Sequence, residues 1–175
     1  MKQKYPIVYA FIDSQNLNLG TLKDLYKHKQ KIYQGWHLDF KKFRQYLADK
    51  FHVQKAFLFI GYLKEYESLY GHLKSSGYQL IFKPTVKDEK GVPKGNVDAE
   101  LVLYSCAIEY TNYDQAIIVS GDGDFYCLLD FLKKKNKLKG VVIPNKYSES
   151  SLLKPFQNYK HFLNPEKNKL EYKKP

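Results

Sequence analysis

Short apolar runs alternate with amphipathic segments along the chain. The runs that predict strands cover residues 7–12, 56–60, 78–82, 116–119 and 141–143. Between them, apolar side chains recur at the spacing of a helix face. The clearest series is Phe125, Leu128, Leu129 and Leu132. Strands that alternate with helices predict an α/β domain with a mainly parallel sheet.

Capping residues mark the other predicted helices. Asp39 predicts a helix that begins at Phe40, and Gly77 predicts the end of a helix over 65–75. A further helix is expected to run from residue 97 to residue 110. The segments 21–36 and 84–95 lack such periodicity and are expected to be an irregular insertion and a mobile loop. We therefore expect one domain over 1–163, followed by a basic, loosely ordered tail over 164–175.

The longest connection between predicted strands joins the third and the fourth, from Pro84 to Gln115. The simplest topology runs one way through strands one to three and then crosses back beside strand one. The expected architecture is a Rossmann-like, three-layer α/β/α domain with strand order 3-2-1-4-5. In such sheets ligands bind at the carboxyl ends of strands, where the strand order reverses.

Acidic residues stand where this crevice is expected. Asp13 directly follows the first strand, and Asp122 and Asp124 directly follow the fourth. Asp98 heads a helical stripe that continues with Leu101, so its side chain is expected to face the protein. The four carboxylates are therefore predicted to converge on one crevice.

Four carboxylates in one crevice repel each other unless a cation lies among them. Oxygen ligands at this density suit Mg²⁺ or Mn²⁺, and such ions promote phosphodiester hydrolysis. Each acid also has a purely structural explanation. Asp13 could cap a turn, Asp98 could complement a helix dipole, and Asp122 or Asp124 could be an N-cap. The joint occurrence at strand ends favours the metal site over these explanations.

The charge of the chain indicates the partner. The formal net charge of +11 favours a polyanion, nucleic acid before membrane, although a composition rich in lysine could also reflect biased codon usage. Arg44 is the only arginine, which argues against bidentate reading of bases. The insertion combines lysines with aromatic residues and could bind single-stranded RNA, or could be a solvated loop. The candidate RNA-binding residues are Lys27, Lys29, Lys31, Tyr33, Trp36 and Lys94.

The cysteines and the apolar runs bear on location. Cys106 and Cys127 form neither a C-x-x-C pair nor a disulfide framework, which suits a reducing cytoplasm. No apolar run approaches the length of a membrane span, so we expect a cytoplasmic protein without a membrane partner. A homodimer is left open.

Three motifs carry a family resemblance. They are Phe11-Ile12-Asp13-Ser14-Gln15-Asn16, then Lys94-Gly95-Asn96-Val97-Asp98, and Val119-Ser120-Gly121-Asp122-Gly123-Asp124-Phe125. In this order and spacing the chain resembles the NYN domain, the LabA-like branch of the PIN-like nuclease superfamily. The resemblance covers roughly residues 7–162. It implies a PIN-like sheet, a Mg²⁺ or Mn²⁺ site and endoribonuclease activity.

The resemblance also implies a role for individual residues. Asp13, Asp98, Asp122 and Asp124 would hold the metal, with Asn16 and Ser120 in support. The segment Ser150-Ser151-Leu152 is similar to a late serine block of the family, but the acid usual after it is absent. That departure leaves the contribution of the late segment open.

Parts of the sequence are also compatible with two other classes of function. The first, a non-catalytic RNA-binding module on the same fold, stays open as the alternative to a ribonuclease. The second is a haloacid-dehalogenase-like phosphatase, which needs a D-x-D motif after the first strand. Here Asp13 is followed by Ser14 and Gln15, so the phosphatase is rejected.

Overall fold

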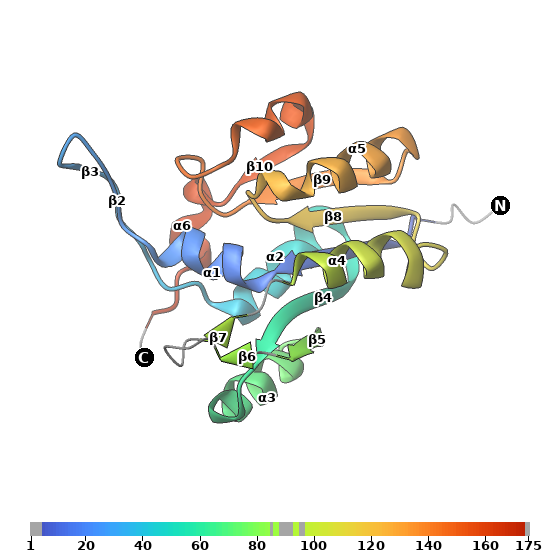
Figure 1. The fold of residues 1–175 in the computed structure, drawn as a ribbon, viewed down its shortest axis with the longest axis horizontal. Helices are drawn as coiled ribbons and strands as arrows, with labels where there is room; N and C mark the ends of the chain where they lie inside the picture. Colours follow the sequence, from blue (N-terminus) through green and yellow to red (C-terminus); the bar gives the residue numbers. More distant parts are fainter. Residues whose placement is uncertain (1–4, 85, 88–92, 95–96, 174–175) are drawn as a thin grey trace.

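The centre of the molecule is a six-stranded sheet whose neighbouring strands are all parallel (Figure 1). The computed structural model describes residues 5–84, 86–87, 93–94 and 97–173. The strands are β1 (Val8–Asp13), β4 (Val53–Tyr62), β5 (Tyr78–Pro84), β8 (Gln115–Val119), β9 (Leu138–Ile143) and β10 (Lys160–Phe162). Their order is β10-β9-β8-β1-β4-β5. The five expected strands therefore lie in the expected order, and β10 extends the sheet beyond β9.

The central strand β1 divides the core into two halves. Alternate side chains of a strand point to opposite faces of the sheet, so Val8, Ala10 and Ile12 join one apolar cluster and Tyr9 and Phe11 the other. The first cluster is covered by α1 (Ser14–Leu22), α2 (Phe40–Phe51) and α3 (Glu67–Ser75). The second is covered by α4 (Asp98–Leu103) and α5 (Tyr126–Lys134). The predicted three-layer α/β/α architecture is confirmed.

Local capping explains where the predicted helices begin and end. The Asp39 carboxylate accepts a hydrogen bond from the Lys42 amide at 3.0 Å and starts α2. Gly77 has φ +92°, a conformation that suits glycine, and it follows the end of α3. The helix that was expected over 97–110 is α4, continued by a π-helical turn at Tyr104–Ile108.

The segment after β1 is more regular than expected. Residues 14–22 form α1, which the sequence pattern did not indicate, because only Ser14, Leu17 and Thr21 of this helix are buried. The insertion then forms an antiparallel hairpin, β2 (Leu25–Lys27) and β3 (Gln30–Tyr33), that projects from the domain (Figure 1). In the expected loop 84–95, β6 (Val86–Lys87) pairs antiparallel with β7 (Pro93–Lys94). Residues 85, 88–92 and 95 lie outside the described residues.

The expectation of a loosely ordered tail is wrong for residues 164–173. A short η5 turn (Asn164–Glu166) leads into α6 (Lys167–Leu170), and Leu170 is 2% exposed within the first apolar cluster. The Leu170 carbonyl accepts a hydrogen bond from the Asp39 amide at 2.8 Å. The segment is held because its apolar side chain fills the core beside α2. Residues 174–175 are not among those described.

Candidate functional site

Asp13 joins the central strand to the helix that follows it. It is the last residue of β1 and the N-cap of α1, and its side chain is 5% exposed. One carboxylate oxygen accepts a hydrogen bond from the Asn16 amide at 3.0 Å. The other accepts one from the Ser120 hydroxyl at 3.3 Å. Burial raises the pKa of Asp13, the Asn16 hydrogen bond opposes this rise, and the charge of Asp98 adds to it.

The turn after β8 presents Asp122 and Asp124. Asp122 is the N-cap of η3 (Gly123–Phe125), and its carboxylate accepts a hydrogen bond from the Asp124 amide at 3.0 Å. The Ser120 hydroxyl accepts one from the Asp122 amide at 3.1 Å, and Ser120 is 2% exposed. The hydroxyl of Ser120 therefore links this turn to the Asp13 carboxylate.

Asn16 makes a second link between the two strand ends. Its side-chain oxygen accepts a hydrogen bond from the Gly121 amide at 2.8 Å. Because Asn16 lies on α1 and Gly121 follows β8, this bond fixes the spacing of the acids on both sides. Asn16 and Ser120, the two residues that the family resemblance implied in a supporting role, therefore connect the strand ends that carry the predicted acids.

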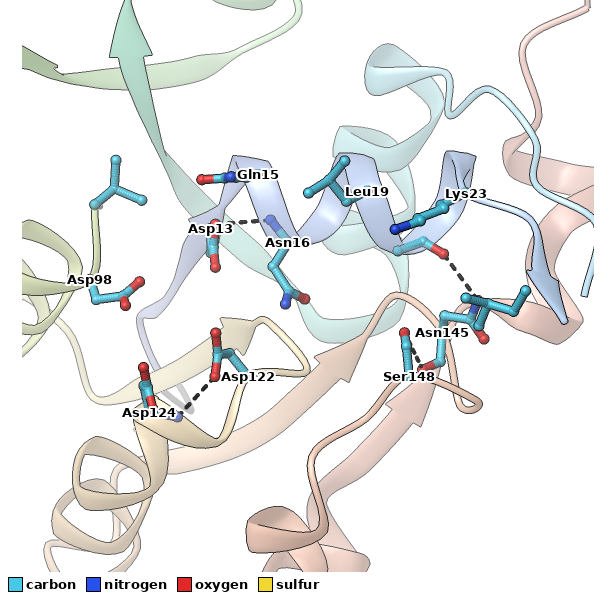
Figure 2. A pocket seen from close by; sticks show the side chains of 13 residues that line it. Asp13, Gln15, Asn16, Leu19, Lys23, Asp98, Asp122, Asp124, Asn145 and Ser148 are labelled. Atoms are coloured by element: carbon cyan, nitrogen blue, oxygen red, sulfur yellow. Dashed lines mark hydrogen bonds between the residues drawn. The ribbon is translucent and has the colours of Figure 1, made fainter. Parts of the chain in front are cut away.

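All four predicted aspartates line one pocket of about 630 Å³ (Figure 2). Asp98 is the first residue of α4 and enters from the side opposite α1, facing Asp13, Asp122 and Asp124. Its helix is positioned by Leu101, which is fully buried in the second cluster. The predicted convergence of the carboxylates is what the fold produces, whatever reaction it serves.

Sequence reasoning missed other residues of the pocket. Its lining also includes Gln15, Lys23, Asn145 and Ser148. Asn145 follows β9 closely, so the argument from strand ends could have found it. It is 1% exposed, donates a hydrogen bond to the Gly20 carbonyl at 3.1 Å and accepts one from the Tyr147 amide at 3.0 Å. Asn145 therefore supports the pocket wall.

The late serine segment packs against the turn that carries two of the acids. Ser150 is the N-cap of η4 (Ser151–Tyr159), and its amide donates to the Gly121 carbonyl at 3.0 Å. A Cβ at Gly123 would lie 2.3 Å from the Ser150 hydroxyl and 2.9 Å from a Leu152 methyl group. Glycine is therefore needed at position 123 for the two segments to lie this close.

The donor set suits a hydrated Mg²⁺ or Mn²⁺ ion better than a closed metal cage. Carboxylate oxygens are the ligands that these ions prefer, and Mg²⁺ keeps several of its waters when it binds to proteins. Across the described part of the chain, no group of three His, Cys, Asp or Glu side chains is already arranged to hold a metal directly. Burial raises the pKa of Asp13 and the charge of Asp98 adds to this rise, so a cation in the pocket would favour the ionised carboxylate.

Two of the predicted RNA-binding residues are core residues instead. Tyr33 is 9% exposed and its hydroxyl donates to the Thr21 carbonyl at 3.0 Å, while Trp36 is 2% exposed. Both anchor the hairpin to α1 and the first cluster, so neither ring is free to stack on a base. That part of the prediction is wrong.

The predicted lysines differ in how available they are. Lys27 and Lys29 are exposed near the tip of the hairpin, where Lys29 has a positive φ. Lys31 pairs with Asp24 at 2.6 Å, which partly neutralises it. Lys94 belongs to β7, and its side chain lies outside the described part of the structure.

A family model matches most of the chain. The NYN domain model matches residues 8–163, which include all three motifs and the whole acidic pocket. The chain is a member of the NYN domain family. A nuclease-like α/β fold, as in the PIN-like nucleases, is what this family predicts, and the six-stranded sheet of the NYN domain is consistent with it.

A solved structure supports the fold of this NYN domain. A protein of unknown function, VPA0982 from Vibrio parahaemolyticus RIMD 2210633, superposes with a TM-score of 0.70 at 19% sequence identity. The similarity covers 98% of this chain and 100% of that one. At this identity the likeness concerns the fold alone. No curated protein matched the sequence.

The helices of the domain bear on membrane association. Among the residues described, no helix combines the length and the apolar character that crossing a bilayer requires.

Proposed function

We propose that this NYN domain is a metal-dependent ribonuclease that hydrolyses phosphodiester bonds of single-stranded RNA. The observation that carries the proposal is the meeting of Asp13, Asp98, Asp122 and Asp124 in one pocket. Membership of a family with a nuclease-like fold also supports it. A structural role alone would not require four acids from three separate segments to share one solvent-filled space.

The four aspartates would hold Mg²⁺ or Mn²⁺, with water completing the coordination. A bound ion of this kind supplies Lewis acidity and lowers the pKa of a bound water. Ser120 and Asn16 keep the carboxylates in place through their hydrogen bonds to Asp13 and to the Gly121 amide. Lys23 adds a positive charge in the lining of the same pocket. It would hold a phosphate that flanks the one being attacked.

The proposal of a single-stranded nucleic acid as the partner rests on charge and shape, and RNA is the form that the family resemblance implies. The chain carries a formal net charge of +11, and the hairpin extends two exposed lysines, Lys27 and Lys29, away from the domain. The hairpin begins at Leu25, which itself lines the acidic pocket. A flexible single strand that enters the pocket could therefore reach these lysines, whereas base reading by arginine is limited to Arg44.

The test is cleavage of a 5′-labelled single-stranded RNA with Mn²⁺ or Mg²⁺, compared with the same reaction in EDTA. Asp122→Asn and Asp124→Asn are expected to reduce cleavage by at least about 100-fold. Asp49→Asn is the matched control, because Asp49 is exposed on α2 and its carboxylate only accepts a hydrogen bond from Gln45. Cleavage that survives in EDTA or in both site variants would contradict the proposal.

The alternative is an RNA-binding module without catalysis. One observation favours it: in the residues that are described, no three potential ligands already form a metal-holding group. The same assay separates the two functions. RNA binding without cleavage in any metal would select the module, whereas metal-dependent cleavage that is lost in the Asp122 and Asp124 variants selects the nuclease.

A further inference from the structure

A second pocket, of about 760 Å³, lies beside the acidic one. Its walls come from α1, the start of α2, the carboxyl end of β4 and the segment from η1 (Lys64–Tyr66) into α3. Apolar side chains, among them Leu58, Ile60 and Leu73, form its floor. This volume falls within the range of small-molecule sites, which are mostly apolar with a few polar groups.

The two pockets share α1 as a common wall. Gln15 and Leu19 line both of them. These residues are four apart, so they lie on the same side of the helix. In Figure 2, Asn16 points toward Asp122, whereas Gln15 and Leu19 lie along the opposite border of α1. A ligand that crosses one helix diameter, about 10 Å, therefore contacts both pockets.

The rim of the second pocket is aromatic and carries little negative charge. Tyr66 and Tyr172 line it and are 48% and 52% exposed. His37, His72 and Lys41 also line it. The acid in this lining, Asp39, already caps α2 through the Lys42 amide and lies 3.8 Å from the Lys42 ammonium. A ligand that matches this lining has a flat ring with polar groups at its edge, joined to a negatively charged backbone.

We infer that the second pocket binds a nucleobase of the same single-stranded RNA whose backbone occupies the acidic pocket. This inference rests on the proposed function. Tyr66 and Tyr172 stack on the base, the apolar floor excludes water, and His37 and His72 contact its polar edge. Aromatic stacking tolerates any base, so the site fixes the position of the strand across α1 more than its sequence.

The test is binding of a fluorescein-labelled 12-nucleotide RNA in EDTA, compared with the same RNA carrying four adjacent abasic riboses. The combined Tyr66→Ala and Tyr172→Ala variant is expected to bind the intact RNA about 5- to 150-fold more weakly, the range for loss of one stacked base. Binding of the abasic RNA should hardly change, because its phosphates are all present. Tyr5→Ala is the matched control, since Tyr5 is 78% exposed and precedes the amino end of β1.

Three outcomes would overturn the inference. They are an unchanged affinity for intact RNA, an equal loss for intact and abasic RNA, and a dimer in solution that the tyrosine variant converts to a monomer. Both tyrosines are exposed, so the variant should keep the melting temperature of the unmodified protein. Failure of the nuclease proposal is distinguishable, because it concerns Mn²⁺-dependent cleavage, whereas base-dependent binding is measured without metal.

Discussion

Replacing Asp13 with asparagine should stabilise the metal-free protein and abolish its response to Mn²⁺. The side-chain oxygen of an asparagine at this position can still accept a hydrogen bond from the Asn16 amide, and its NH₂ group can donate one to the Ser120 hydroxyl. Each of the two hydrogen bonds of Asp13 is therefore replaced by another. The substitution removes the negative charge of the Asp13 carboxylate. Burial raises the pKa of this carboxyl, the Asn16 hydrogen bond opposes the rise, and the Asp98 charge adds to it. A carboxyl whose pKa rises on folding weakens the folded state above that pKa.

The size of the effect can be bounded. Each unit by which the folded pKa exceeds the unfolded one costs about 1.4 kcal/mol, and a gain of about 1 kcal/mol raises the melting temperature of a chain this long by about 2–4 °C. As the pH falls to about 4, the ordinary pKa of an aspartate, the difference in protonation between the folded and unfolded states narrows, so the advantage of the variant shrinks. If the unmodified protein binds Mn²⁺ as proposed, the ion at a hundred times its Kd should add about 2.7 kcal/mol to its stability.

The assay is thermal unfolding at pH 7.5 and pH 4, and at pH 7.5 in EDTA and in Mn²⁺, with Asp49→Asn as the control on α2. We expect Asp13→Asn to melt higher than the unmodified protein in EDTA at pH 7.5, and to gain nothing from Mn²⁺. A lower melting temperature of the variant in EDTA would refute the claim that the Asp13 carboxylate lowers the stability of the metal-free protein. An equal gain from Mn²⁺ would refute its role in holding the ion.

Further predictions concern packing, charge and RNA contact. Gly123→Ala should lower the free energy of unfolding by about 1–3 kcal/mol in urea titrations, because its Cβ would lie 2.3 Å from the Ser150 hydroxyl; Gly121→Ala, whose nearest contact would be 3.3 Å, should cost less. Glu149→Gln should cost up to about 3–5 kcal/mol of stability, because Lys160, with a side chain 1% exposed, loses the negative charge that lies 3.1 Å from its ammonium. Adding Lys160→Met should restore most of this stability, and no recovery would contradict the account. Lys27→Ala with Lys29→Ala should reduce the slope of log affinity for RNA against log salt by about 1.4, whereas Trp36→Ala should cost about 3–5 kcal/mol of stability and leave that slope unchanged.

The position of the acids could be predicted because it follows from local patterns and one topological rule. Asp13, Asp122 and Asp124 each follow a short apolar run, and the carboxyl ends of parallel strands meet at one edge. The prediction for Asp98 followed from the apolar stripe on its side of the helix, which includes the fully buried Leu101. Neither inference needed knowledge of distant contacts beyond the order of the strands.

The residues that were misjudged depend on distant contacts. Tyr33 and Trp36 stand in a lysine-rich segment and resemble stacking residues. In the fold, however, the Thr21 carbonyl accepts hydrogen bonds from both the Tyr33 hydroxyl and the Trp36 amide. Leu170 stands among charged residues, yet it completes the core beside α2. Such residues carry no periodic signal, because their burial is decided by segments that the pattern does not connect to them.

Of the six strands in this sheet, the central strand β1 is synthesised first. Asp13 leaves the ribosome long before its hydrogen-bond partner Ser120, which comes 107 residues later. The turn that carries Asp122 and Asp124 is held by a hydrogen bond from the Ser150 amide to the Gly121 carbonyl. A nascent or truncated chain therefore has isolated aspartates but no pocket, so whatever chemistry these acids perform is withheld until translation has passed the last of these segments.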